Sequence, residues 1–322
     1  MTIKEIVKRN SFISNKLATI KRELFFYIKS DHNFKVKTFK KTHGRLPNLE
    51  TPSSFSEKLL WSSENYRDSR FVWYADKYLV RQHVKKTIGE KYLIPIYDVI
   101  DDPNKLCLDK YPNRFVLNAT HGSNMVILCN DKSTFDVKKA KRSVKSWLKE
   151  NYYHQLREWH YNYIKPRVMV MEHIGAKDGT APLDYKFFCF NGEPAIVTLD
   201  IDRFGDVSKR NVYNLDWNLI PDVSLTRPVD LDNIYPKPEN FDEMKSIVKV
   251  LARGFEHVRV DLYNVDGKIY FGELTFLHAA AGILGKITPY SYNEELGKLF
   301  TLPQRNIDGW MYEGEPDELT NF

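Results

Sequence analysis

Two carboxylates lie within one short segment whose pattern favours a pair of strands. The segment is VRVDLYNVDGKIYFGELTF, residues 258–276, and it contains Asp261 and Glu273. Its apolar residues alternate with polar ones, and the turn pair Asp266-Gly267 near its middle is typical of a β-hairpin. Two carboxylates close together repel each other unless a cation lies between them. A hard divalent cation such as Mg²⁺, which prefers oxygen ligands and bridges to phosphates, would satisfy both.

The length of the hairpin loop decides whether the two carboxylates share a face, because successive side chains point to opposite faces of a strand. A two-residue turn puts Asp261 and Glu273 on opposite faces, whereas a three-residue loop over 265–267 brings them together. The composition favours the three-residue loop, because that loop collects apolar side chains on one face. The expected apolar face holds Val258, Val260, Leu262, Tyr270, Leu274 and Phe276, and the expected polar face holds Arg259, Asp261, Glu273 and Thr275.

An ion pair would explain the same polar face without a metal. In this register Arg259 lies directly opposite Glu273, and acidic and basic residues often face each other across strands. The residues alone therefore leave the metal site and the ion pair equally open.

Length and composition limit the class of protein. The 322 residues are enough for about two packed domains plus an extension, and 14% aromatic with 28% charged residues is typical of a folded chain rather than a disordered one. No apolar run is long enough to cross a bilayer, so we expect a soluble, cytoplasmic protein. Three widely spaced cysteines, Cys107, Cys129 and Cys189, predict reduced thiols rather than a disulfide or a zinc site.

The positive charge of the chain is concentrated at its beginning. Residues 1–43 carry eleven Lys or Arg against three acidic residues, a net of +8, while the whole chain has +6. This basic segment, with the apolar cluster at 24–28, could rest on an anionic membrane face at the inner membrane, or form a solvated helix packed by its aromatic side. A nucleic-acid partner is not expected, because the basic excess does not continue into the body.

Periodicity and breakers outline the order of elements. The turn-rich stretch 44–56 predicts a linker that separates the basic segment from the body, with Ser56 as a helix N-cap. A helical pattern over 57–90 ends at Gly89. Strands are expected in 92–100, 115–117, 126–128, 167–174, 185–190 and 193–201, and helices in 135–150 and 241–255.

Five pieces of the chain occur in the order found in a known family. They are FVLNATHGS, VMVMEHIG, DYKFFCFNG, VRVDLYN and GKIYFGELTF. Together they resemble the ATP-grasp superfamily, and specifically its TupA-like branch, which is associated with the synthesis of teichuronopeptide and other surface polysaccharides. The resemblance covers roughly residues 50–300 and implies an α+β fold in which two subdomains clasp ATP. The expected organisation is a basic helical N-terminal extension (1–50), a pre-ATP-grasp region (51–110), a lid subdomain (111–178) and a catalytic subdomain with a C-terminal tail (179–322).

The resemblance also implies roles for individual residues. Glu172 and the backbone at 173–174 correspond to the hinge beside adenine and ribose, and Lys186 to a strand lysine that reaches the nucleotide. The turn at 120–123 resembles a loop over the phosphates, although by its residues alone it could be a plain hairpin turn. The implied nucleotide contacts are Asn118, His121, Gly122, Ser123, Glu172, Ile174 and Lys186, the implied Mg²⁺ ligands are Asp261, Glu273 and Thr275, and the implied catalytic residues are Arg259, Arg210 and Lys186.

One position departs from the family pattern. Asn118 stands where relatives carry a lysine that contacts a phosphate, so either Lys165 or Arg167 supplies the missing charge or nucleotide binding is weakened; we expect that activity survives. Among the turn residues Asp200, Asp202, Arg203 and Arg210, the planar fork of Arg210 suits a carboxylate or a phosphate.

The reaction that the resemblance implies is an ATP-dependent, ADP-forming carboxylate–amine ligation. A substrate carboxylate attacks the γ-phosphate, and an amine then displaces phosphate from the acyl phosphate to form an amide. The branch implies a uronic acid of a surface polysaccharide precursor as one substrate and an amino acid as the other. A kinase, a glycosyltransferase-like enzyme and a non-catalytic nucleotide-binding partner are the alternatives.

Overall fold

The computed structural model describes residues 30–175, 182–201 and 208–316. Its strands are β1 (Ile96–Ile100), β2 (Phe115–Ala119), β3 (Val126–Cys129), β4 (Val168–Glu172), β5 (Asp184–Phe190), β6 (Glu193–Ile201), β7 (Lys209–Asn214), β8 (Ser224–Leu225), β9 (His257–Val265), β10 (Lys268–Thr275) and β11 (Ile287–Thr288). Its α-helices are α2 (Asp31–His43), α3 (Phe55–Asn65), α4 (Ser69–Ala75), α5 (Val80–Thr87), α6 (Val137–Trp147), α7 (Tyr153–Leu156), α8 (Phe241–Ala252), α9 (His278–Ala281) and α10 (Tyr290–Leu299). Short 3-10 helices are η1 (Glu90–Tyr92), η2 (Pro103–Lys105), η3 (Leu108–Lys110) and η4 (Trp159–Asn162).

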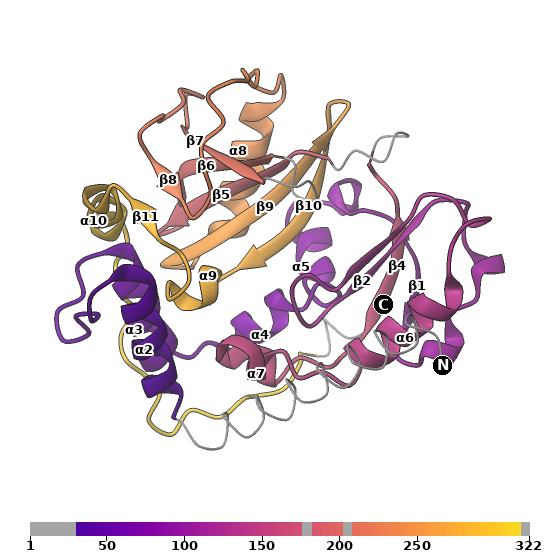
Figure 1. Ribbon diagram of the computed structural model, residues 1–322, viewed down its shortest axis with the longest axis horizontal. Helices are drawn as coiled ribbons and strands as arrows, with labels where there is room; N and C mark the ends of the chain where they lie inside the picture. Colours follow the sequence, from indigo (N-terminus) through magenta and orange to yellow (C-terminus); the bar gives the residue numbers. More distant parts are fainter. Residues whose placement is uncertain (1–29, 176–181, 202–207, 317–322) are drawn as a thin grey trace, which may run out of the picture.

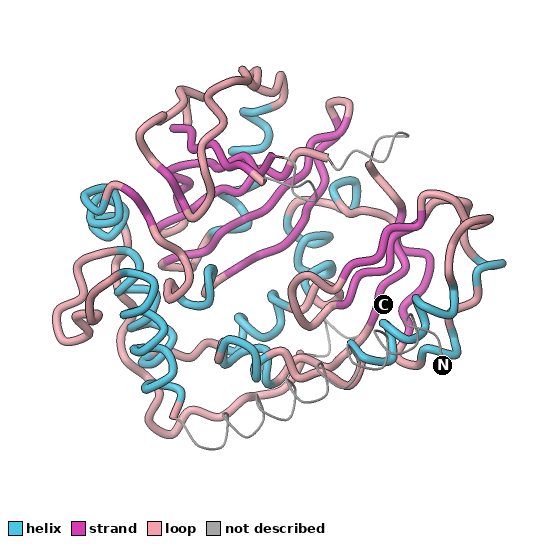
Figure 2. Tube along the Cα trace, in the orientation of Figure 1, coloured by secondary structure: helices cyan, strands magenta, loops and turns pink. Residues whose placement is uncertain are grey.

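Nine of the described strands form two antiparallel sheets in different halves of the molecule (Figure 1), and β8 and β11 form a separate two-stranded sheet. The four-stranded sheet has the order β1-β4-β2-β3, and the five-stranded sheet has the order β10-β9-β5-β6-β7. Figure 2 shows the same division: the strands gather in two groups, and helices lie around and between these groups. Helix α8 packs on one face of the five-stranded sheet and α6 on the four-stranded sheet, and each sheet has its own apolar core. The other face of the five-stranded sheet carries polar side chains beside a third apolar cluster, in which Phe188 and Phe190 pack against Phe55 of α3.

The predicted single helical stretch over 57–90 is wrong in detail, because it is three helices. The carboxylate of Asp68 accepts the backbone N–H of Arg70, and that of Asp76 accepts the N–H of Tyr78. Each aspartate therefore begins a new turn and interrupts the helical pattern. The predicted strands and the helices near 135–150 and 241–255 are confirmed.

The predicted linker between the N-terminal segment and the body is wrong for the described residues. Phe39 of α2 is fully buried against Leu60 of α3, and the Lys35 ammonium donates to Ser63 Oγ at 3.1 Å. Helix α3 begins at Ser54 rather than at Ser56, because the Ser54 side chain and Glu57 form a capping box. Helix α2 is thus packed by its aromatic side, as one of the two alternatives has it. Residues 1–29, including the apolar cluster at 24–28, lie outside the described residues.

The hairpin register differs from the prediction, yet its consequence holds. Lys268 pairs with Val265 across a two-residue turn, in which both Asp266 and Gly267 have positive φ. A bulge at Gly272 then shifts the register so that Glu273 pairs with Asp261. A Cβ on Gly272 would lie 3.0 Å from the Asp261 carbonyl oxygen, so this close approach needs glycine.

The bulge changes which side chains share a face. Tyr270 leaves the predicted apolar face, which Phe271 and Ile269 join instead. Asp261 and Glu273 lie together because of the bulge and not because of a longer loop.

Two further expectations can be compared with the described residues. None of the described helices is long and apolar enough to cross a membrane. All three cysteines are free; Cys129 and Cys189 are buried and Cys107 is exposed.

Candidate active site

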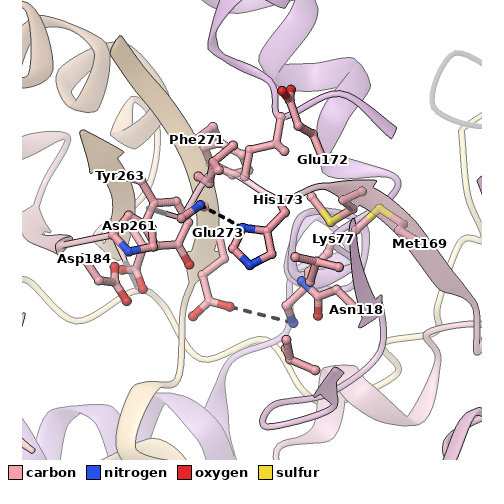
Figure 3. Close-up of a pocket in the computed structure, with 18 of the residues that line it drawn as sticks. Lys77, Asn118, Met169, Glu172, His173, Asp184, Asp261, Tyr263, Phe271 and Glu273 are labelled. Atoms are coloured by element: carbon pink, nitrogen blue, oxygen red, sulfur yellow. Dashed lines mark hydrogen bonds and ion pairs between the residues drawn. The ribbon is translucent and has the colours of Figure 1, made fainter. Parts of the chain in front are cut away.

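A cavity of about 430 Å³ lies between the two sheets. The four-stranded sheet supplies its apolar side, including Val116, Met169 and Met171, together with Glu172, and the five-stranded sheet supplies Asp184, Asp261 and Glu273. Figure 3 shows Asp184, Asp261 and Glu273 on one side and Asn118 and Met169 on the other. We call this space the first cavity. It is lined by Lys77, Arg81, Ile94, Val116, Asn118, Gly122, Ser123, Asn124, Val126, Leu128, Met169, Met171, Glu172, His173, Ile174, Gly175, Pro182, Asp184, Asp261, Tyr263, Phe271, Gly272 and Glu273.

Arg259 joins the two carboxylates of the hairpin. Its guanidinium donates to Asp261 at 2.6 and 2.7 Å, to Glu273 Oε1 at 2.9 Å and to Thr275 Oγ1 at 3.1 Å. Burial alone would lower the pKa of Arg259, but the charges of Asp261 and Glu273 outweigh burial and raise it. The structure therefore contains the ion pair that the residues alone left open.

A second cation also holds Asp261. The Lys186 ammonium donates to Asp261 Oδ2 at 2.5 Å and to Asp184 Oδ2 at 2.6 Å. Burial raises the pKa of Asp261, and the charges of Arg259 and Lys186 oppose that rise. Asp184, which sequence reasoning missed, thus belongs to the same cluster, and its spacing of two from Lys186 is the signal that places both on one face of β5.

The donor set of the hairpin fits a hard divalent cation. Asp261 and Glu273 lie opposite each other and both line the first cavity, and Mg²⁺ is often held by one or two carboxylates plus phosphate oxygens. Within the described ranges no group of three or more His, Cys, Asp or Glu could hold a metal by itself. Thr275 does not line the cavity; its hydroxyl donates to Glu273 Oε1 at 3.1 Å. A metal here would depend on ligand oxygens.

The lid side of the first cavity contains most of the predicted nucleotide contacts. Asn118 of β2, Gly122 and Ser123 of the following turn, and Glu172 and Ile174 at the end of β4 all line it. The His121 ring does not line the cavity, because it is buried and donates from Nε2 to the Trp147 carbonyl at 2.8 Å; a contact through the backbone N–H groups of this turn stays a prediction. The turn directs that side chain into the core and leaves its neighbours at the cavity.

The positive charge near Asn118 comes from residues that sequence reasoning did not name. Lys77 and Arg81 line the first cavity, and the Lys77 ammonium lies 3.7 Å from Glu273 Oε2 (Figure 3). Neither Lys165 nor Arg167 lines it; Arg167 pairs with Asp76 at 3.0 Å. Lys77 follows a helix and carries no local motif, so only the fold could reveal it.

A second cavity of about 230 Å³ continues along the same face of the five-stranded sheet. The side chains of Tyr263, Asp261, Arg259 and His257 follow one another at every second position of β9. Asp261 and Tyr263 line the first cavity, and Arg259 lines the second. The second cavity is lined by Phe55, Ser56, Leu59, Lys186, Phe188, Arg210, Leu225, Thr226, Arg227, Arg259, His278, Ala279, Gly282, Leu284, Gly285 and Ile287.

The second cavity is strongly basic. Lys186, Arg210, Arg227 and Arg259 line it, and no acidic side chain does among the described residues. Arg210 is held by Asp200, which accepts from both Nε and Nη2. Burial alone would raise the pKa of Asp200, but the hydrogen bonds and charge of Arg210 outweigh burial and lower it to about 2. Two other members of the predicted cluster, 202 and 203, lie outside the described residues.

Comparison with known families identifies this arrangement. The model described as TupA-like ATPgrasp matches residues 57–301. The chain belongs to the TupA-like ATP-grasp family. The match confirms the predicted family. The described helices and antiparallel sheets confirm the predicted α+β fold class. None of the curated proteins matches the chain.

Several solved ATP-grasp ligases are distantly similar. D-alanine–D-alanine ligase from Bacillus anthracis, complexed with ATP, is 14% identical with a TM-score of 0.38; the match covers 66% of this chain and 58% of that one. L-Amino acid ligase from Bacillus licheniformis is 12% identical with a TM-score of 0.39, covering 76% and 48%. The ligase PsnB, complexed with a precursor variant, Mg and ADP, is 11% identical with a TM-score of 0.37, covering 76% and 65%. This TupA-like chain therefore spans little more than half of the first of these ligases.

Proposed function

We propose that the chain is an ATP-dependent carboxylate–amine ligase that works through an acyl phosphate. The observation that carries this proposal is the wall shared by the two cavities. Asp261 faces the first cavity, and the two cations bonded to it, Lys186 and Arg259, face the second. A nucleotide in one cavity and an anionic substrate in the other would meet at this wall.

The first cavity suits ATP by shape and by charge. Its apolar side, built from residues such as Ile94, Met169 and Met171, offers a surface for a flat base. Lys77 and Arg81 supply positive charge for phosphates in place of the lysine absent at 118. Asp261 and Glu273 would hold Mg²⁺, which when bound neutralises charge on the phosphates, and Thr275, which does not line the cavity, would act only through its hydrogen bond to Glu273.

The second cavity suits the substrate carboxylate. Its four cationic side chains include Arg259 and Lys186 at the wall, where the carboxylate oxygen would attack the γ-phosphorus. The same two cations would then offset the charge that develops on the transferring phosphoryl group. Arg210, fixed by Asp200, would orient the substrate from the far side.

The substrate class follows from the branch of the family. We propose a uronic acid of a surface polysaccharide precursor as the carboxylate and an amino acid as the amine. A cationic cavity with an apolar rim of Phe55, Leu59 and Phe188 supports an anionic organic substrate, and the family resemblance supports the sugar. The contact of the basic N-terminal segment with a membrane face or with assembly partners stays a prediction.

The test combines the protein with ATP, Mg²⁺, UDP-uronic acids and a panel of amino acids. Ligation predicts ADP, free phosphate and a dehydrated adduct by mass, each dependent on both substrates. ADP without free phosphate would indicate a kinase, release of UDP without ATP a glycosyltransferase, and no turnover a binding partner; each would contradict the proposal.

A single variant tests the metal assignment. Glu273→Gln keeps the size of the side chain but removes a charged ligand, so the adduct should fall by at least about 10²-fold. Glu193→Gln, on a glutamate with 61% side-chain exposure, is the matched control and should keep full activity. Full activity of the Glu273 variant would refute the assignment.

A further inference from the structure

The second cavity contains a histidine that the proposed reaction has not yet used. His278 begins α9, and its ring lines the cavity beside Phe55 and Phe188. Its Nδ1 lies 3.3 Å from Nε2 of His257. His257 lies two positions before Arg259 and on the same face of β9. His257 Nδ1 in turn lies 2.9 Å from the Cys189 carbonyl oxygen. The two rings thus form a chain from the buried sheet to the cavity.

The carbonyl at the buried end fixes where the protons are. A carbonyl oxygen only accepts, so His257 Nδ1 carries a hydrogen and donates it to Cys189. Burial lowers the pKa of His257 to about 3, so the ring is neutral and its Nε2 is an acceptor. His278 Nδ1 must then be the donor to that nitrogen. A neutral His278 consequently carries a lone pair on Nε2.

The Nε2 atom of His278 is open to the cavity. It makes no hydrogen bond within the part of the chain that the structure describes, and it is not among the buried polar atoms that lack a partner. Since the other ring nitrogen is held by His257, the ring cannot turn without losing that bond. The acceptor therefore points to the space that the ring lines.

Positive groups surround His278. Arg259 comes from β9, Arg210 from β7 and Lys186 from β5, and Arg227 lines the same cavity, while the His257 ring beside Nδ1 is neutral. Burial and the charges of Arg259 and Arg210 lower the pKa of His278 well below its ordinary value. The ring is neutral near pH 7, and an anion in the cavity would offset part of the surrounding charge and make the ring more basic.

We propose that His278 is the general base that takes the proton from the incoming amine in the second half of the reaction. This role rests on the proposed ligation. The amine nitrogen forms a bond to the carbonyl carbon of the acyl phosphate, and an N–H proton passes to His278 Nε2. The C–O bond to phosphate then breaks, and amide and inorganic phosphate leave. The attached nitrogen in the tetrahedral intermediate is acidic, so a weakly basic imidazole suffices.

The backbone after His278 holds the ring in place. Ala279, Ala280 and Ala281 all have positive φ, a backbone conformation that is unfavourable for residues other than glycine. The Ala281 N–H donates to the Leu277 carbonyl at 2.8 Å, and Ala280 and Ala281 are buried. A left-handed turn of small residues places His278 at the cavity where larger side chains would not fit.

The first experiment measures the protons directly. In ¹⁵N-histidine-labelled protein, long-range ¹H–¹⁵N NMR at pH 7 should show His278 neutral and protonated on Nδ1, with assignment from the His278→Asn variant. A ring protonated on Nε2, or on both nitrogens, would overturn the proposal whatever the outcome of the activity assays.

The second experiment separates the two halves of the reaction. Hydroxylamine is largely uncharged at neutral pH and attacks an acyl phosphate without a base. With ATP, Mg²⁺ and UDP-glucuronic acid, His278→Asn should still form hydroxamate within about threefold of the parent, but amide formation with amino acids should fall by roughly 10²-fold or more. The asparagine amide can still donate to His257, so the fold is kept.

Controls make each failure distinct. His32→Asn, on a histidine with 60% side-chain exposure, should leave both products unchanged. Equal losses of hydroxamate and amide, or no loss of either, would overturn the role of His278 alone. Absence of hydroxamate from the parent protein would refute the proposed function and this role with it. Protonation of the amine lowers amide formation in parent and variant alike as pH drops, and the parent should show an additional loss only well below pH 6.5, where His278 becomes protonated.

Discussion

The two cavities differ in how the fold builds them. The first draws its lining from both sheets and mixes both signs of charge with apolar side chains, whereas the second lies against one sheet, and all the charged residues that line it in the described structure are cationic. A ligand of mixed character, with a base and metal-bound phosphates, matches the first. A simple anion matches the second. One face of β9 therefore contributes to both cavities. The side chain on this face is acidic at Asp261, which lines the first cavity, and basic at Arg259, which lines the second.

The largest expected effect comes from Arg259, which lines the second cavity and binds two carboxylates that line the first. Arg259→Met leaves Asp261 and Glu273 facing each other and removes a cation from the second cavity, so we expect ligation to fall by about 10³-fold. Product mass and free phosphate measure the effect. Arg305→Met, at a surface pair with Asp308, is the control. If the folded Arg259→Met variant kept full activity, the role of Arg259 between the two cavities would be wrong. If Arg259→Met does not fold, Arg259→Lys, which keeps the positive charge, is measured in its place.

A change confined to the second cavity should affect one substrate only. Arg210→Met removes a cation that contacts Asp200 and leaves the first cavity intact, so KM for the carboxylate substrate should rise by roughly 10–100-fold with KM for ATP unchanged. In this variant the Asp200 carboxylate still has Arg227, whose Nη1 lies 3.3 Å from Asp200 Oδ2, as a cationic partner, so we expect Asp200 to remain ionised. Equal changes in both KM values would show that the two cavities are not separate sites.

A buried carboxyl close to the wall makes stability depend on pH. Burial raises the pKa of Glu158 to about 8, while the charge of Lys35 opposes the rise. The folded state favours the protonated form, so this contribution to stability is complete below the unfolded pKa near 4.5 and is lost as pH rises through about 8. Urea unfolding at pH 6 and pH 9 should show that Glu158→Gln is less sensitive to this rise than the parent, by roughly 2 kcal/mol. Identical pH dependence would contradict the burial of a neutral carboxyl.

The smallest effect should come from restoring the family's lysine in the first cavity. Asn118→Lys adds a third cation beside Lys77 and Arg81, so the dissociation constant of ATP with Mg²⁺ should fall by about three- to tenfold. Calorimetric titration measures this, and KM for the carboxylate substrate should not move. If only the variant, and not the parent, were stabilised by ATP, the view that Lys77 and Arg81 suffice would be wrong.

Much of the fold could be predicted from local sequence patterns. The turn at Asn191-Gly192, the helix at 241–252 and the alternation along β9 are short-range signals, and the structure contains each of them. The sequence predicts correctly that Asp261 and Glu273 share a face, but it predicts a three-residue loop where the structure has a two-residue turn. The bulge at Gly272 makes up the difference, and it depends on a close backbone approach that no local pattern reveals. Glycine inside a strand was the available signal.

The site residues that could not be predicted from the sequence are those that reach the cavities from distant parts of the chain. Lys77 reaches the first cavity from the helical region, and His278 meets His257 across 21 positions. Neither has a motif, since their roles depend on how α4, α9 and the sheets pack. His121 is the opposite case, because its motif is visible in the sequence, yet packing directs its ring toward Trp147, so a contact with a phosphate would have to come from the backbone of the turn.

The shared wall has a consequence for how the two ligands depend on each other. Lys186 and Arg259 are neutralised by carboxylates in this structure, and a ligand that draws the oxygens of Asp261 and Glu273 to itself would return both cations to the neighbouring space. Occupancy on one side should therefore tighten affinity on the other, and thermodynamic reciprocity requires the same factor in both directions. Such heterotropic coupling would favour a filled pair of sites over either singly occupied form.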